Sequence, residues 1–229
     1  MALDEQSHIA FGVKLLADLV ARDPECKEAM IDLLREVIPW TVGVLVPPNW
    51  DRRYTECFGF TLEEIGAEGF RSVESKLRAV GLSREEIQRG ISLPLDLPVE
   101  ELVRRSLRLA QANVIGEKTG QASRDPELIG WMFENMAVTV DAHRADGAPL
   151  TVQWDFSDTD PWFIRVENGS SRAQRGRAPR PDVTLGCTWE DWTRVMAGHI
   201  DPRRLVLRGR IRPRGKLRVL MRMDKLFGR

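Results

Sequence analysis

The last fifty residues alternate short apolar stretches with turn and capping signals, an order that few folds accommodate. Val183, Leu185 and Cys187 occupy alternate positions, which predicts a half-buried strand. Thr188 and Asp191 then have the Thr-x-x-acid spacing of a capping box, so a helix is expected to begin at this point. The apolar residues of this helix share one face: Trp189, Trp192, Val195 and Met196.

Two further elements follow Asp201-Pro202. Leu205, Leu207 and Ile211 would point to one side of a strand and the intervening arginines to the other. After Gly215, residues 216–227 predict a final helix that is apolar on more than one side, and such a helix is expected to be buried between other elements.

The preceding residues predict a helix and more strands. Asp125-Pro126 is a typical helix start. Alternating apolar residues predict strands over 138–143, 150–156 and 162–166, with turns at Asp146-Gly147 and Asn168-Gly169. We therefore predict an α+β fold with a five-stranded, mostly antiparallel sheet and helices packed on one face.

The N-terminal half shows helical periodicity throughout. Amphipathic helices are predicted over 7–21, 26–37, 61–80 and 99–115, with Pro39 ending the second of them before an apolar, irregular passage at 40–50. Thr61 with Glu64, and Ser83 with Glu86, have capping-box spacing. Because residues 116–123 are polar and contain glycine, we predict a helical domain at 1–120 and a second domain at 121–229.

The order of parts in the second domain resembles the sterol carrier protein type 2 (SCP-2) lipid-transfer family. The resemblance rests on the Pro181–Leu185 strand, the Trp189–Trp192 helix start, the Met196–Gly198 helix end, the Gly209–Ile211 strand and a last helix ending at Leu226–Phe227. It covers roughly residues 125–229. Members of that family often have Gly-Asp before the last helix, where this chain has Gly215-Lys216, so the capping of that helix is expected to differ.

The resemblance implies a cavity between sheet and helices that holds a sterol, a fatty acid or an acyl-CoA-like ester. From the residues alone, the same side chains fit a filled core or a cavity wall. The residues expected to contact such a ligand are Val152, Trp154, Phe156, Trp189, Trp192, Met196, Leu220, Met221, Met223 and Phe227.

The overall arrangement is also similar to mycothiol-dependent maleylpyruvate isomerases, in which a helical domain precedes a domain of this kind. Those enzymes hold a metal through histidines of the helical domain, whereas here residues 9–142 contain no histidine. His8, His143 and His199 lie in three different elements without metal-ligand spacing. We therefore expect no metal and no cofactor.

Composition and charge limit the function further. No apolar run approaches a membrane span, the acidic N-terminus lacks a signal-peptide pattern, and three widely spaced cysteines fit a reducing, cytoplasmic location. The preference for Arg over Lys hints at a bacterial source. Residues 172–229 carry 16 Lys and Arg against 5 Asp and Glu, although the chain as a whole is neutral. This basic end would neutralise the acidic half or meet an anionic membrane surface, whereas a nucleic-acid partner is not expected.

Three functions stay open at this point. The favoured one is a non-catalytic carrier of a hydrophobic small molecule, with the helical half as a lid, a docking surface or the contact of a homodimer. A second is an isomerase or cyclase of secondary metabolism or aromatic degradation that uses the same cavity, with Tyr54, His143, Asp155 and His199 as candidate polar groups. The third is a helical protein-interaction module.

Overall fold

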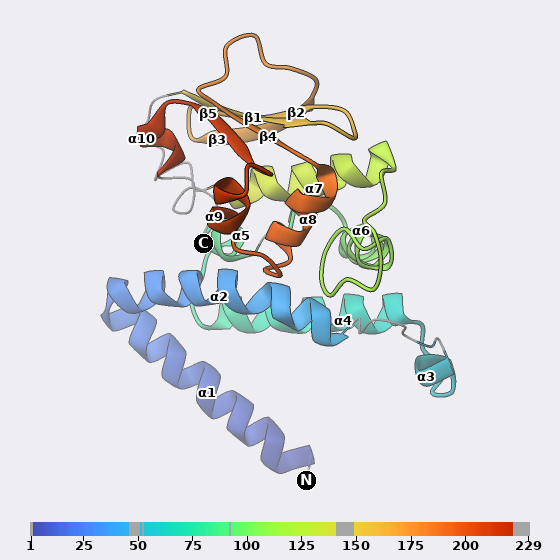
Figure 1. Ribbon diagram of the computed structural model, residues 1–229. Helices are drawn as coiled ribbons and strands as arrows, with labels where there is room; N and C mark the ends of the chain where they lie inside the picture. The colour runs from blue at the N-terminus through green and yellow to red at the C-terminus, as the bar shows by residue number, and fades with distance from the viewer. Residues whose placement is uncertain (1, 46–50, 52, 92, 141–148, 222–229) are drawn as a thin grey trace.

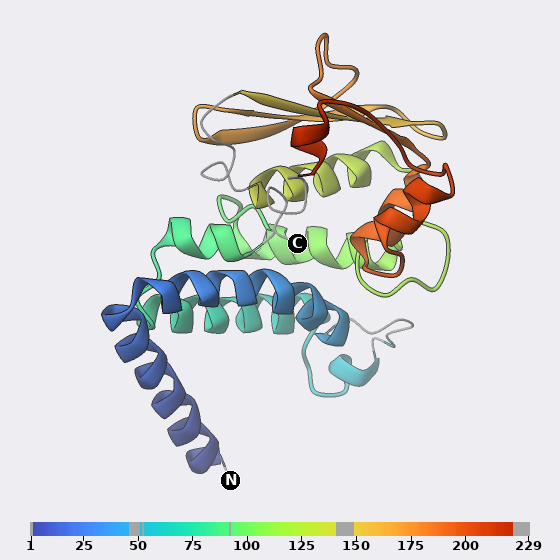
Figure 2. The same ribbon diagram turned by 60° about the vertical axis from the view of Figure 1, so that its left-hand side comes forward.

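The computed structural model describes residues 2–45, 51, 53–91, 93–140 and 149–221. It is a stack of layers (Figures 1 and 2), with a sheet at one end, helices beneath it and a long helix projecting at the far end. In the described part, no helix is long and apolar enough to cross a bilayer.

The N-terminal half is helical, as predicted. Its elements are α1 (Ala2–Arg22), α2 (Pro24–Leu45), α3 (Arg53–Glu56), α4 (Leu62–Ala79), α5 (Arg84–Gly90) and α6 (Val99–Gln111). The predicted capping boxes at the starts of α4 and α5 are both present, with the Thr61 and Ser83 side chains accepting from the backbone N–H groups of Glu64 and Glu86.

The prediction that Pro39 ends the second helix is wrong. Pro39 lies inside α2, which continues to Leu45, so residues 40–45 are helical and not irregular. Proline in a helix interior removes one backbone donor and costs about 3 kcal/mol, which disfavours the helix but does not end it here. The remaining part of the predicted irregular passage, 46–50, lies outside the described residues.

Helix α1 exposes an unusual amount of apolar surface. Ile9, Phe11, Leu15, Leu16 and Leu19 are each between 42% and 69% exposed, and they lie on one broad side of the helix. We refer to these five residues as the α1 apolar face. In Figures 1 and 2 the helix diverges from the body as it approaches the N-terminus.

The C-terminal half contains a five-stranded mixed sheet that is mostly antiparallel, which confirms the predicted fold class. The strands are β1 (Leu150–Phe156), β2 (Trp162–Glu167), β3 (Ser170–Arg175), β4 (Val183–Cys187) and β5 (Arg212–Gly215), in the spatial order β3-β2-β1-β4-β5. Only the β1–β4 pair is parallel. The Asn168-Gly169 turn between β2 and β3 has both residues at positive φ, as the two-residue hairpin signal predicted.

Helices α7 (Pro126–Thr139), α8 (Trp189–Met196), α9 (Pro202–Leu207) and α10 (Leu217–Leu220) complete this half. Asp125 caps α7 with Pro126 in its first turn, as predicted. The predicted strand at 138–143 is wrong where it is described, because α7 continues through Thr139 and buries apolar residues on most of its circumference. Residues 141–148, including the predicted Asp146-Gly147 turn, lie outside the described residues.

The prediction of a strand through Leu205 and Leu207 is also wrong. The Asp201 side chain accepts from the backbone N–H of Arg203, and Pro202 occupies the first turn, so these residues begin helix α9. The strand starts later, at Arg212. Of the predicted final helix, only α10 is described, and residues 222–229 lie outside the described part.

The described buried side chains form two clusters. One joins α2, α4, α5 and part of α6 around Ile31, Ile87 and Leu102. The other lies between the sheet and α7, α8 and α9 and includes Leu109 near the end of α6. Helix α6 therefore contributes to both clusters, and the domain boundary near residue 120 stays a prediction.

Candidate functional site

An aromatic cluster fills the space between the sheet and its helices. Trp154 lies in the central strand β1, and its ring meets the ring of Phe133 from α7 at 5.3 Å and that of Trp192 from α8 at 5.4 Å, both edge to face. Phe156, two residues along the same strand, meets Trp189 of α8 at 5.5 Å. The sheet and two helices thus bring together aromatic rings that are far apart in the sequence.

Trp162 of β2 extends the aromatic cluster on the side of Phe133. The ring of Trp162 stacks on Phe133 with centroids 5.1 Å apart and an interplanar angle of 9°. In the register of the sheet, Trp162 is directly opposite Trp154. Trp154 and Phe133 are fully buried, whereas Trp162 is only half-buried.

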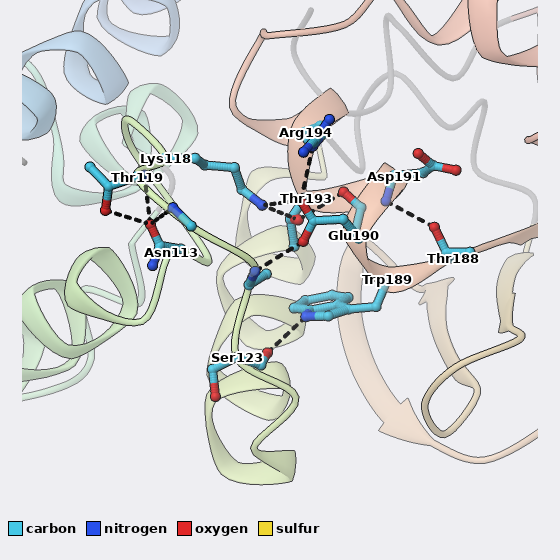
Figure 3. A network of polar contacts seen from close by, with 12 residues as sticks. Asn113, Lys118, Thr119, Ser123, Thr188, Trp189, Glu190, Asp191, Thr193 and Arg194 are labelled. Atoms are coloured by element: carbon cyan, nitrogen blue, oxygen red, sulfur yellow. Dashed lines mark hydrogen bonds and ion pairs between the residues drawn. The ribbon is translucent and has the colours of Figure 1, made fainter.

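The two tryptophans of α8 differ in how their indole N–H groups are satisfied. Trp189 Nε1 donates to the backbone oxygen of Ser123 at 2.8 Å (Figure 3). Trp192 Nε1 is buried and has no hydrogen-bond partner among the described residues, and Trp192 is 8% exposed. A buried donor without an acceptor is costly, so Trp192 is the polar group at which a ligand's acceptor would gain most.

Most of the predicted ligand residues that the structure describes belong to this region. Val152, Trp154, Phe156, Trp189 and Trp192 are buried in the cluster. Met196 and Leu220 are partly buried and pack against it. Met221, in contrast, is 76% exposed. Met223 and Phe227 lie outside the described residues.

The candidate catalytic residues that the structure describes are not brought together. Tyr54 is exposed on α3, which lies far from the sheet in Figure 1. Asp155 is on the opposite face of β1 from Trp154 and Phe156, where its carboxylate accepts from Arg177 at 2.8 Å. His199 is exposed after α8, on the helical side of the sheet, and His143 lies outside the described residues.

A polar network fastens the loop that precedes α7 to the start of α8 (Figure 3). Lys118 Nζ donates to Thr193 Oγ1 at 2.5 Å and lies 3.7 Å from Glu190 Oε1, although only 5% of the lysine side chain is exposed. Glu190 Oε2 accepts from the backbone N–H of Ala122 at 2.9 Å, and its Oε1 accepts from Arg194. The predicted linker at 116–123 is therefore held firmly against α8.

Burial changes the titration of this pair. Desolvation lowers the pKa of Lys118, and the nearby Glu190 only partly opposes that effect. For Glu190, desolvation raises the pKa, but the hydrogen bonds from Ala122 and Arg194 and the charge of Lys118 outweigh it, and the pKa is lowered. Sequence reasoning missed this pair because 72 residues separate its members and neither residue lies in a motif.

Asp191 has a different role from the one predicted. The Thr188 side chain accepts from the Asp191 backbone N–H at 3.0 Å, which confirms the helix start. The Asp191 carboxylate does not close the capping box, however. It is buried and accepts from Arg210 Nε at 3.0 Å and from Arg210 Nη2, which links α8 to the turn before β5.

Two further groups hold the ends of the strands in place. Lys216 Nζ donates to the Asp182 carboxylate at 2.6 Å, and the Lys216 backbone N–H donates to Asp182 O. Lys216 thus uses its side chain where the SCP-2 pattern has an acidic residue. Cys187 is buried beside Phe156, and desolvation, with the charges of Asp191 and Asp158, raises the pKa of its thiol to about 12, so it stays protonated at neutral pH.

Among the described residues, no group of three or more His, Cys, Asp or Glu side chains is placed to hold a metal ion.

The family described as "Alkyl sulfatase C-terminal" matches residues 129–229, which contain the sheet and helices α8 to α10. The match covers a little under half of the chain, and nearly the same residues carry the resemblance to the SCP-2 family. A search of curated proteins found no match.

Several solved structures are similar to the chain. The stereoselective inverting sec-alkylsulfatase Pisa1 from Pseudomonas sp. is 15% identical, with a TM-score of 0.39 over 77% of this chain and 31% of that protein. The chain therefore spans about a third of that alkylsulfatase's length. Sterol Carrier Protein 2 from Yarrowia lipolytica is 15% identical (TM-score 0.32; 38% of this chain, 73% of that protein), and the ubiquinone synthesis protein UbiJ-SCP2 is 10% identical (TM-score 0.36; 47% and 94%). These values are too low to transfer an activity or a ligand.

Proposed function

We propose that the SCP-2-like half binds a hydrophobic small molecule that carries a hydrogen-bond acceptor, such as a fatty acid, a sterol or an acyl ester. The observation that carries this proposal is the buried indole N–H of Trp192, which has no partner among the described residues. A ligand oxygen beside Trp192 Nε1 would relieve the cost of burying that donor.

The surroundings of Trp192 suit the apolar part of such a ligand. Trp154 packs against one side of its ring, and Met196 lies one helical turn further along α8. Met196 is only partly buried, and a thioether side chain adapts to ligands of different shape. Apolar burial contributes about 25 cal/mol per Å² before ordering costs, so a long alkyl chain binds with few polar contacts.

The family match supports an alkyl-chain ligand, since the matching family takes its name from sulfatases of alkyl compounds. No observation favours the isomerase or cyclase alternative, because the described candidates Tyr54, Asp155 and His199 do not converge. A non-catalytic binding or carrying role is therefore the function that the geometry supports best.

The test is displacement of a fluorescent fatty acid from the full chain by unlabelled competitors. The wild type is expected to bind a long-chain fatty acid more tightly than an alkane of equal length. Trp192→Phe keeps an aromatic ring but removes the N–H, and it should weaken fatty-acid binding about tenfold, the value of one hydrogen bond to a charged acceptor. Alkane binding should stay unchanged.

Trp162→Phe is the matched control, because it makes the same chemical change in another ring of the same cluster. Equal losses in the two variants would show that Trp192 contributes packing alone. No displaceable binding by the wild-type protein would refute the proposed function itself.

A further inference from the structure

Arginines that form ion pairs with carboxylates are distributed unevenly over the described surface. Over the rest of the described surface most of them hold carboxylates, as Arg78 holds Glu74 and Arg194 holds Glu190. In the segment from α9 to α10, five exposed arginines have no ion-pair partner among the described residues: Arg204, Arg208, Arg212, Arg214 and Arg218. Two other cations of that segment, Arg210 and Lys216, hold the carboxylates of Asp191 and Asp182.

The same segment exposes apolar side chains at its turn. Leu207, the last residue of α9, is 88% exposed, and Val206 beside it is 41% exposed. Helix α9 is anchored underneath by Leu205, which is fully buried. Leu207 is thus held out into solvent by a fixed element, with Arg204 and Arg208 on either side of it in the sequence.

Strand β5 follows α9 in the chain and forms one edge of the sheet. It is the last strand in the order β3-β2-β1-β4-β5 and pairs on one side only, with β4. Arg212 and Arg214 lie opposite Gly186 and Thr184, so both belong to the sheet face turned away from the aromatic cluster. In Figure 1, α9, β5 and α10 follow one another at this end of the molecule.

From this arrangement we propose that the α9–β5 edge, formed by Arg204, Leu207, Arg208, Arg212 and Arg214, docks on an anionic lipid bilayer. Each arginine near an anionic bilayer contributes about fivefold in affinity, and a single exposed leucine that enters the interface adds to the attraction. A nucleic acid accounts less well for the edge, because Leu207 and Val206 are aliphatic and offer no ring on which a base stacks.

The inference does not depend on the proposed ligand, because vesicle binding is measured with empty protein. The experiment is flotation of the full chain with vesicles of phosphatidylcholine alone and of phosphatidylcholine mixed with phosphatidylserine, at low and high salt. Binding is expected only to the mixed vesicles, and it should fall steeply as salt screens the charges.

Arg208→Glu combined with Arg212→Glu should weaken that binding at least about 25-fold, since two arginines each contribute about fivefold. The matched control is Arg172→Glu combined with Arg180→Glu. These two arginines are also exposed and hold no ion pair among the described residues, and Arg172 lies on β3 at the opposite edge of the sheet. The net charge change is the same in both variants, so only the position differs. Leu207→Ser should weaken binding several-fold without changing its salt dependence.

Three results would overturn the proposal: equal binding to phosphatidylcholine alone, equal loss in the two charge-reversal variants, or binding to duplex DNA in place of vesicles. Far-UV circular dichroism of each variant distinguishes lost docking from lost fold. Failure of vesicle binding would leave ligand displacement unaffected, so the two proposals are tested separately.

Discussion

Two tryptophans of α8 provide an internal comparison for the buried indole N–H. Trp189 and Trp192 are three residues apart on the same helix, and both are more than nine-tenths buried. Trp189 Nε1 donates to Ser123 O, whereas Trp192 Nε1 has no partner among the described residues. Substitution of each by phenylalanine removes the same atoms from two different hydrogen-bonding situations.

The two changes should have clearly different costs. Replacing tryptophan by the smaller phenylalanine should lower the free energy of unfolding by about 2 kcal/mol at either site through lost packing, at about 0.8 kcal/mol for each carbon-sized group removed. At Trp189 the lost hydrogen bond adds about 1 kcal/mol, so Trp189→Phe should cost about 3 kcal/mol. At Trp192 the substitution also removes an unsatisfied buried donor, which stabilises the folded protein by about 1–3 kcal/mol and offsets the lost packing. Trp192→Phe should therefore leave the free energy of unfolding within about 1 kcal/mol of the wild type.

Urea unfolding followed by far-UV circular dichroism measures both values without relying on tryptophan fluorescence, which the substitutions alter. The denaturant dependence should be equal in the two variants, so that midpoints are comparable. Equal destabilisation by the two substitutions would show that the Trp192 N–H is satisfied in the folded protein, and the reasoning from an unpaired donor would fail.

Two further predictions concern the polar network and the helical half. Glu190→Gln should lower the free energy of unfolding by about 2–3 kcal/mol, because it leaves the buried Lys118 ammonium without its carboxylate. Lys118→Met should lower it by about 1 kcal/mol, and in the double variant it should remove most of the effect of Glu190→Gln. A double-mutant cycle in urea measures this coupling. The folded state lowers the pKa of Glu190, so the stability that Glu190 contributes is present above its unfolded pKa of about 4.3 and is lost as pH falls through its folded pKa. The folded state also lowers the pKa of Lys118, which destabilises the fold below the unfolded pKa of about 10.4. That destabilisation lessens as pH rises through the folded pKa of Lys118. An acid-unfolding profile of Glu190→Gln identical to that of the wild type would contradict this assignment. We further predict that a second copy of the chain covers the α1 apolar face, because its five side chains, each 42–69% exposed, form a broad apolar surface on one side of the helix. Light scattering after size exclusion should then give a dimer that Leu15→Glu with Leu19→Glu converts to a folded monomer, and a monomeric wild type at all concentrations would refute it.

Local signals in the sequence predicted the element boundaries that depend on a few neighbouring residues. The caps at Thr61, Ser83 and Asp125 and the turn at Asn168-Gly169 are all observed, since each rests on hydrogen bonds or dihedral angles within four residues. The strand predicted through Leu205 and Leu207 is a helix, although these residues fit a period of two. Asp201-Pro202, which starts a helix, was the decisive signal there.

The site was predictable only in part, for a physical reason. The aromatic residues of β1 and α8 were expected to face one another, and they do. Which indole N–H finds an acceptor depends on Ser123, 66 residues before Trp189, and the burial of Lys118 depends on a loop that the sequence predicts as a linker. Contacts across such separations depend on how the layers pack, which the local periods of the chain do not encode.

The central claim is that the SCP-2-like half holds a hydrophobic molecule. Native mass spectrometry of the freshly purified full chain, followed by solvent extraction, tests it most directly. We expect a mass above that of the chain and a lipid-like molecule with an acceptor group in the extract. We also expect a reduced amount of that molecule in Trp192→Phe. A bare chain mass, together with no uptake of added fatty acid, would contradict the claim.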